Sequence, residues 1–133
     1  MQFRIDFLTT EVSNPFLGSC DNDTIMITGA DAVTMKTMPM NLCGVLSGSH
    51  VYVSVKDVDS VKLTITLTSL ATQKWNILVR QFDSSQTDYL APRGCLQYFT
   101  GTTGTVSSFN YRAGCTAHPC THLQAPRYTV SPL

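Results

Sequence analysis

The sequence predicts an all-β fold, an antiparallel, jelly-roll-like β-sandwich. Three observations predict it. Apolar and polar residues alternate in several segments, turn residues separate these segments at short intervals, and no window shows the periodicity of an amphipathic helix. Alternation buries one face of a strand and leaves the other in water, which is typical of antiparallel sheets. The 133 residues suffice for one sandwich core, whereas two complete domains would be cramped.

The clearest strand is expected at residues 61–68, where valine, leucine and isoleucine alternate with lysine and threonine. Because Trp75 begins another alternating segment, we expect it to lie in the core rather than on a binding surface. The remaining expected strands lie at residues 3–7, 24–28, 51–55 and 75–82.

The composition changes after residue 82. Residues 83–93 are polar and lack alternation, which predicts a linker. A second patterned stretch follows, with expected strands at 96–100 and 105–109, but from residue 112 onward most of the chain is expected to be irregular. The expected organisation is a domain at 1–82, a linker at 83–93 and the beginning of a second domain at 94–133.

The charge pattern excludes several classes of function. Lysine and arginine number 9, as do aspartate and glutamate, and no basic run suggests a nucleic-acid partner. No apolar run approaches the ~18 residues of a membrane span. The sequence contains no phosphate loop, dinucleotide fingerprint or Gly-x-Ser-x-Gly motif, and no cysteine opens a predicted helix, where a thiolate would be stabilised. We therefore expect no enzyme and no catalytic residue.

Five cysteines are many for a small cytosolic domain. They favour a secreted, extracellular protein, and the odd number suits a piece of a longer chain. The first seven residues alternate and include an early acid, which indicates a strand rather than a signal peptide. The alternative is a cytosolic chain with free or metal-bound thiols. The cysteines are Cys20, Cys43, Cys95, Cys115 and Cys120.

The order of motifs within residues 1–82 is specific. A first strand leads to Cys20-Asp21-Asn22-Asp23, then come a second strand, Leu42-Cys43-Gly44 and three further strands. This order resembles the later part of a CUB domain, the extracellular sandwich of complement proteases, developmental metalloproteases and spermadhesins. The Cys-x-x-Asp and Cys-Gly motifs of that family match these two segments.

Residues 91–101 read APRGCLQYFTG and residues 104–111 read GTVSSFNY. This run resembles the opening of another CUB domain and is similar to tandem CUB-type secreted proteins of arthropods. The two resemblances imply that the chain spans a domain junction and holds an incomplete sandwich. First strands missing from the sandwich would leave a sheet edge unpaired.

The resemblance also implies a disulfide between Cys20 and Cys43, with two buried free thiols as the alternative. Cys95 matches the first cysteine of a CUB domain. It is a candidate disulfide partner for Cys115 or Cys120, or it remains unpaired.

Many CUB domains bind calcium through clustered acids, which supply the hard oxygen ligands that calcium requires. Asp23 matches one such acid, but a second would fall before Met1 and a third is replaced by Ser69-Leu70. We therefore expect no calcium cofactor and a local capping or pairing role for Asp23. The triplet Asn22-Asp23-Thr24 is a glycosylation sequon, which makes Asn22 a candidate glycosylation site.

Four potential zinc ligands, Cys115, His118, Cys120 and His122, lie within eight residues. Pro119 in their midst restricts wrapping around a metal, so a loop with exposed histidines is the preferred interpretation. A small intracellular zinc protein centred on this cluster is the alternative.

The resemblance implies a non-catalytic extracellular interaction module that binds a protein or glycan partner through loops on a rigid scaffold. Two alternatives share the fold: an accessory domain of a secreted protease, and a calcium-independent carbohydrate-binding module.

Overall fold

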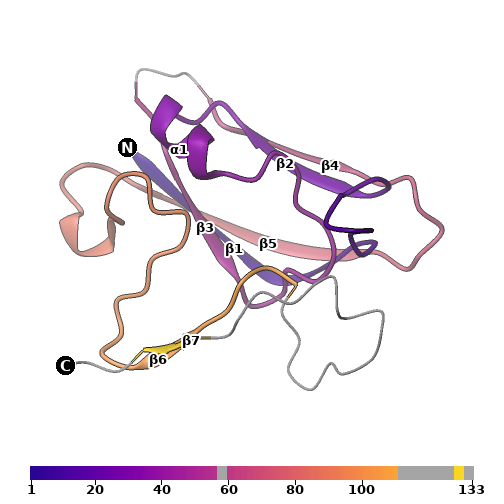
Figure 1. Cartoon of the computed structure of the whole chain (residues 1–133). Helices are drawn as coiled ribbons and strands as arrows, with labels where there is room; N and C mark the ends of the chain where they lie inside the picture. The colour runs from indigo at the N-terminus through magenta and orange to yellow at the C-terminus, as the bar shows by residue number, and fades with distance from the viewer. Residues whose placement is uncertain (57–59, 111–127, 131–133) are drawn as a thin grey trace.

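The computed structural model describes residues 1–56, 60–110 and 128–130 (Figure 1). Strands dominate these residues and helix is nearly absent, so the predicted all-β fold is confirmed. The strands are β1 (Gln2–Glu11), β2 (Thr24–Thr28), β3 (His50–Ser54), β4 (Lys62–Thr66), β5 (Lys74–Phe82), β6 (Gly104–Val106) and β7 (Tyr128–Val130). Two short helices accompany them, α1 (Ala32–Thr37) and the 3₁₀ turn η1 (Thr87–Tyr89).

The sandwich is formed by a three-stranded sheet and a two-stranded sheet, both antiparallel. The first has the order β3-β1-β5, and the second pairs β2 with β4. Figure 1 shows the β2–β4 pair lying over one face of the larger sheet. A third, smaller pair joins β6 to β7. The five strands expected in residues 1–82 therefore exist, with ends that differ by a few residues.

The core lies between the two sheets. Ile5 and Phe7 of β1 and Val51 of β3 face Ile25 and Ile27 of β2, and all five are buried. Burying a side chain of this kind stabilises the fold by about 1.5–3 kcal/mol. The period-two alternation of the sequence therefore identifies the inward positions of β1, β2 and β3 correctly.

Helix α1 was not expected from the sequence. It has only six residues, too few for helical periodicity to show. The side chain of Asp31 caps it by accepting a hydrogen bond from the Thr34 N–H at 2.8 Å. In the sequence, the capping residue Asp31 was therefore the only local indication of this helix, since six residues show no apolar stripe.

One further expectation for the C-terminal part is wrong. Residues 96–100 form no strand, although the Tyr52 N–H of β3 donates to the Leu96 carbonyl at 2.8 Å. A single bond of this kind does not build a ladder. The three-residue strand β7 pairs with β6, and it lies in the stretch of which most is expected to be irregular.

Residues 91–110 pack directly on the sandwich. The buried side chain of Gln2 accepts a hydrogen bond from the Ala91 N–H at 2.8 Å and donates one to the Ala91 carbonyl at 3.2 Å. Arg93 forms an ion pair with Asp31 at 3.0 Å. The division into a domain, a linker and a second domain stays a prediction. The end of the expected linker nevertheless contacts β1 and the N-cap of α1, and Leu96 beyond it bonds to β3.

The expectation that Trp75 lies in the core is wrong, because its side chain is 52% exposed. Trp75 lies opposite Thr10 of β1, which is fully buried, so it does point to the core-facing side of the sheet. The facing sheet contains two strands against three in the larger sheet. We attribute the exposure of Trp75 to this shortfall, since the alternation predicts the face of a strand but not what covers it.

Candidate functional site

A pocket of about 630 Å³ opens where residues 97–106 fold over the outer face of β1 and β3. Its wall combines a cation, an imidazole, aromatic rings and several amide and hydroxyl groups. The side chains that matter below are Arg4, His50, Gln97, Tyr98 and Phe99.

The sheet register explains how the first strand and the third build the floor of this site. Arg4 lies opposite Tyr52, and Asp6 lies opposite His50. All four occupy positions between the inward-facing residues, so they share the outer face of the sheet. Cross-strand neighbours on one face have Cβ atoms about 4.5–5.5 Å apart, which brings the four side chains into mutual contact.

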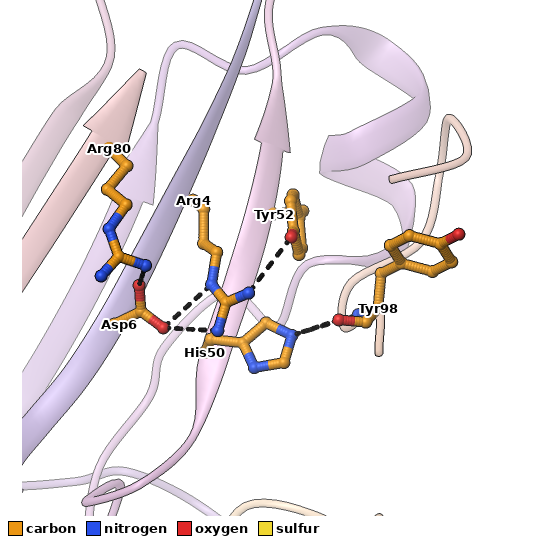
Figure 2. A network of polar contacts seen from close by, with 6 residues as sticks. All are labelled: Arg4, Asp6, His50, Tyr52, Arg80 and Tyr98. Carbon is orange, nitrogen blue, oxygen red and sulfur yellow. Dashed lines mark hydrogen bonds and ion pairs between the residues drawn. The ribbon is translucent and has the colours of Figure 1, made fainter. Parts of the chain in front are cut away.

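Arg4 is held in place by Asp6 and Tyr52 (Figure 2). Its Nη2 lies 2.8 Å from Asp6 Oδ1, and its Nη1 donates to the Tyr52 hydroxyl at 3.4 Å. The guanidinium also lies 5.6 Å from the centre of the Tyr52 ring, within the range of a cation–π interaction. Arg80 of β5 reaches the second oxygen of Asp6 at 3.4 Å. Two arginines therefore share one carboxylate, which leaves a net positive charge beside the pocket.

His50 connects the sheet to the loop that covers it. Its Nε2 lies close to both backbone groups of Tyr98 (Figure 2). When Nε2 carries the proton, it donates to the Tyr98 carbonyl oxygen at 3.0 Å. When Nε2 is unprotonated, it accepts from the Tyr98 N–H at 3.2 Å. Burial lowers the pKa of His50 below its ordinary value, and the charge on Arg4 lowers it further. The imidazole is therefore neutral at neutral pH.

Aromatic rings pack around His50 with their edges toward one another. The His50 ring lies 4.9 Å from Phe99 and 5.5 Å from Tyr52, and Tyr52 lies 6.3 Å from Tyr98. Edge-to-face contacts at such distances are favourable and fix ring orientation. Phe99 nevertheless keeps 47% of its surface exposed, so it offers an apolar face to a ligand.

Chemically, the site is suited to recognition. It combines an exposed aromatic ring with donors and acceptors whose positions are set by strands and by one another. Within residues 1–56, 60–110 and 128–130, no three His, Cys, Asp or Glu side chains are grouped as a metal site.

The structure places Asp23 in the interior of the protein. Its fully buried carboxylate accepts hydrogen bonds at 2.9 Å from the Ser13, Thr68 and Ser69 N–H groups and at 2.7 Å from the Ser69 hydroxyl. Gln73 adds a donor at 3.3 Å. Burial raises the pKa of Asp23, but the hydrogen bonds from Ser69, Ser13 and Thr68 outweigh it and hold the pKa well below the usual range. Asp23 thus ties three loops together, and the absence of a calcium cofactor stays a prediction.

The disulfide between Cys20 and Cys43 is confirmed, with an S–S distance of 2.09 Å and Cα atoms 5.8 Å apart. Cys95 is half-buried and bonds to no other described cysteine. Its candidate partners Cys115 and Cys120 lie outside the described residues.

Of two other predicted sites, the structure describes only one. The zinc alternative at Cys115, His118, Cys120 and His122 falls on residues that the structure does not describe. Asn22 is exposed, and its carbonyl accepts from the Thr68 hydroxyl at 2.9 Å, which leaves its side chain at the surface. Glycosylation of Asn22 stays a prediction.

The residues of the pocket were missed by sequence reasoning. The alternation does indicate that Arg4, Asp6, His50 and Tyr52 point outward. It does not indicate that β1 and β3, almost fifty residues apart in sequence, are neighbours. Nor does it show that the loop around Tyr98 returns to cover them.

Comparison with known families gives one match, in the C-terminal part of the chain. Residues 92–131 match the family model of the animal CUB domain, and this range contains the stretch whose sequence resembles a CUB opening. No curated protein and no solved structure matches the chain significantly. None of the described helices has the length and apolar character to cross a membrane. The match at residues 92–131 supports a CUB-domain family, and the antiparallel all-β fold is consistent with a CUB-like sandwich.

Proposed function

We propose that the protein is a non-catalytic extracellular interaction module whose binding site is the pocket between β1, β3 and residues 97–106. CUB domains are in general extracellular interaction modules, and the match at residues 92–131 supports this general role for the protein. The observation that carries the proposal is the pocket itself, where an exposed Phe99 adjoins an ordered set of polar groups. Ordering these groups before binding reduces the entropy that a ligand must overcome.

A glycan is the ligand class that suits the pocket best. Phe99 supplies an aromatic surface for the apolar face of a sugar ring, while Arg4 and Gln97 supply hydrogen bonds for hydroxyl groups. Among the described residues no carboxylate lines the pocket, and Asp6, the neighbour of Arg4, is already paired with two arginines. Binding at this site therefore requires no calcium.

The test is a glycan-array screen with purified protein in the presence of a chelator, followed by titration calorimetry with the best ligand. Phe99→Ala should weaken binding at least tenfold. Phe16→Ala removes a similarly exposed ring, 70% accessible, from a loop that does not line the pocket, and should leave affinity unchanged. Binding that only calcium restores, or equal losses in both variants, would overturn the proposal.

We also propose that the chain is secreted and belongs to a tandem array of CUB domains, as in the arthropod proteins that it resembles. The Cys20–Cys43 disulfide supports secretion, because such bonds persist in oxidising compartments. Peptide mapping of the native protein without reduction is the direct test. A free thiol at both positions would argue against it.

A further inference from the structure

Two side chains of the larger sheet fasten residues 91–98 to the sandwich, and each contacts both backbone groups of one residue. Gln2 of β1 accepts from the Ala91 N–H at 2.8 Å and donates to the Ala91 carbonyl at 3.2 Å. His50 of β3 places its Nε2 at 3.0 Å from the Tyr98 carbonyl oxygen and at 3.2 Å from the Tyr98 nitrogen. The two attachments therefore look alike, but they are built from different chemical groups.

The two attachments differ in their response to acid. The amide of Gln2 has a separate donor and acceptor, and neither of them is titratable. The Nε2 of His50 is a single atom, which either donates to the Tyr98 carbonyl or accepts from the Tyr98 N–H. An imidazolium can only donate. Protonation therefore removes one of the two bonding modes at Tyr98 and changes nothing at Ala91.

Protonation of His50 also adds a cation to a group that already holds two. Asp6 lies opposite His50 across the strand pair, and Arg4 and Arg80 both pair with the Asp6 carboxylate (Figure 2). An imidazolium would be the third cation beside this one carboxylate. Like charges close together are unfavourable, and they are more so where water is partly excluded.

The surroundings of the imidazole favour its neutral form. The Tyr52 ring lies 5.5 Å from it on the strand side, and Tyr98 lies on the loop side. Burial opposes the charge on His50 most, and the charge on Arg4 comes second. The Tyr98 carbonyl and Asp6 offset these effects only in part, so the pKa of His50 lies below its ordinary value. Because the closed loop lowers this pKa, protonation favours an arrangement in which the loop has moved away.

The residues that His50 attaches form a wall of the proposed binding site. Phe99 follows Tyr98 directly, lines the pocket and places its ring 4.9 Å from that of His50. The segment is held before Tyr98 by the Leu96 carbonyl, which accepts from the Tyr52 N–H, and after it by the pairing of β6 with β7. Release at Tyr98 would therefore let Phe99 move between two points that stay attached.

We propose that His50 is a positioning residue of the pocket and an acid-sensitive latch. Neutral His50 holds Tyr98 and Phe99 in the closed arrangement, and its protonation releases both residues and weakens glycan binding. The effect on the glycan rests on the function proposed above, whereas the release of the loop does not. The protein thus binds its partner at neutral pH and releases it in an acidic environment.

The first test needs no ligand and uses NMR of the full, isotope-labelled chain, titrated from neutral to acidic pH. The Tyr98 amide signal should shift with the same midpoint as the His50 imidazole. Its protection from hydrogen exchange, relative to the intrinsic rate at each pH, should fall at least fivefold. The Ala91 amide, which Gln2 holds, is the internal control and should keep its protection. A Tyr98 amide that passes the His50 midpoint unchanged, or an equal loss at Ala91, would overturn the latch.

The second test measures affinity on the same glycan array at pH 7.4 and at one pH unit below the His50 midpoint. At the lower pH about one molecule in eleven keeps a neutral imidazole, so the apparent dissociation constant should rise about tenfold. His50→Gln supplies an amide with a separate donor and acceptor, as Gln2 does, and retains His118 and His122. Its dissociation constant should change less than twofold between the two pH values.

The two tests separate the latch from the glycan site. A tenfold loss that persists in His50→Gln, or a wild-type affinity that does not change with pH, would show that His50 does not govern binding. An array without binding at either pH would overturn the glycan site, and the NMR titration alone then decides whether the latch exists.

Discussion

The side-chain amide of Asn110 lies across the turn at Gly44. Its Oδ1 accepts a hydrogen bond from the Val45 N–H at 2.7 Å, and its Nδ2 donates to the Cys43 carbonyl at 3.0 Å. Gly44 has a φ of +84°, a conformation that side chains with a Cβ rarely adopt. Asn110 thereby closes the segment from residue 91 onto the disulfide-bonded turn.

Gly44→Ala should destabilise the protein by about 1–3 kcal/mol, through backbone strain and through collision of the new Cβ with the Asn110 amide. Gly48→Ala is a matched control, because Gly48 has a φ of +82° but nothing within 4 Å of the added carbon. Urea denaturation of both variants isolates the contribution of the contact. Adding Asn110→Ala should recover part of the loss at Gly44 and none at Gly48, and equal costs for the two glycines would contradict this account.

Asp23 should make the protein sensitive to acid. Its lowered folded pKa means that its contribution to stability is complete above the ordinary aspartate value of about 3.9, and is lost as the pH falls through the folded value. Asp23→Asn should cost roughly 2–3 kcal/mol at neutral pH, because the amide cannot accept from the same donors. The free energy of unfolding, measured by urea titration from pH 7 to pH 2, should fall less steeply in this variant. Asp21→Asn, at an exposed carboxylate, is the control, and an unchanged acid profile in Asp23→Asn would refute the prediction.

His50 should make stability depend on pH in a higher range. Since burial lowers its folded pKa, the unfolded chain takes up the proton first as the pH falls below about 6.5. The contribution of neutral His50 is thus present above that value and lost as the pH falls through the folded pKa. His50→Gln should flatten this part of the profile, as measured by thermal unfolding between pH 7.5 and pH 5. NMR titration of the imidazole provides the direct check, and a pKa above the ordinary value would contradict it.

Asn22 should carry a glycan when the chain is expressed in a eukaryotic secretory pathway. The residue is exposed, and the sequon Asn22-Asp23-Thr24 is intact. Asn22→Gln should abolish the mass shift that an N-glycosidase produces. Asn14→Gln, at an asparagine followed by proline, should leave the shift unchanged, and a wild-type protein without any shift would end the hypothesis.

The strands of the sandwich could be predicted because their inward residues are buried on one side only. Ile5 and Phe7, or Ile25 and Ile27, alternate with polar residues, and local periodicity carries that information. The exposure of Trp75 could not be predicted in this way, since it depends on how many strands the facing sheet has. Periodicity within a strand predicts which of its residues point inward, but it does not predict whether another strand covers them.

The pocket needed information of another kind. Its floor combines Arg4 with Tyr52, and its cover brings Tyr98 to His50, contacts that span 48 residues each. Nothing in the local pattern around Tyr98 indicates this return of the chain. The disulfide could be predicted because the Cys20 and Cys43 motifs resemble those of a family, not because of their spacing.

The bond between Gln2 and Ala91 has a mechanical consequence. Tension applied to the chain beyond residue 110 is borne first by the amide of Asn110 at the Cys43–Val45 turn, and then by the Leu96 carbonyl. The tension next reaches Gln2, whose side chain forms hydrogen bonds with both the N–H and the carbonyl of Ala91. The contacts of Tyr98 with His50 and the ion pair of Arg93 with Asp31 resist the same pull. The polar stretch from 83 to 90 therefore carries tension only after all of these attachments have failed, and a pull from the C-terminal side loads β1 and β3 first.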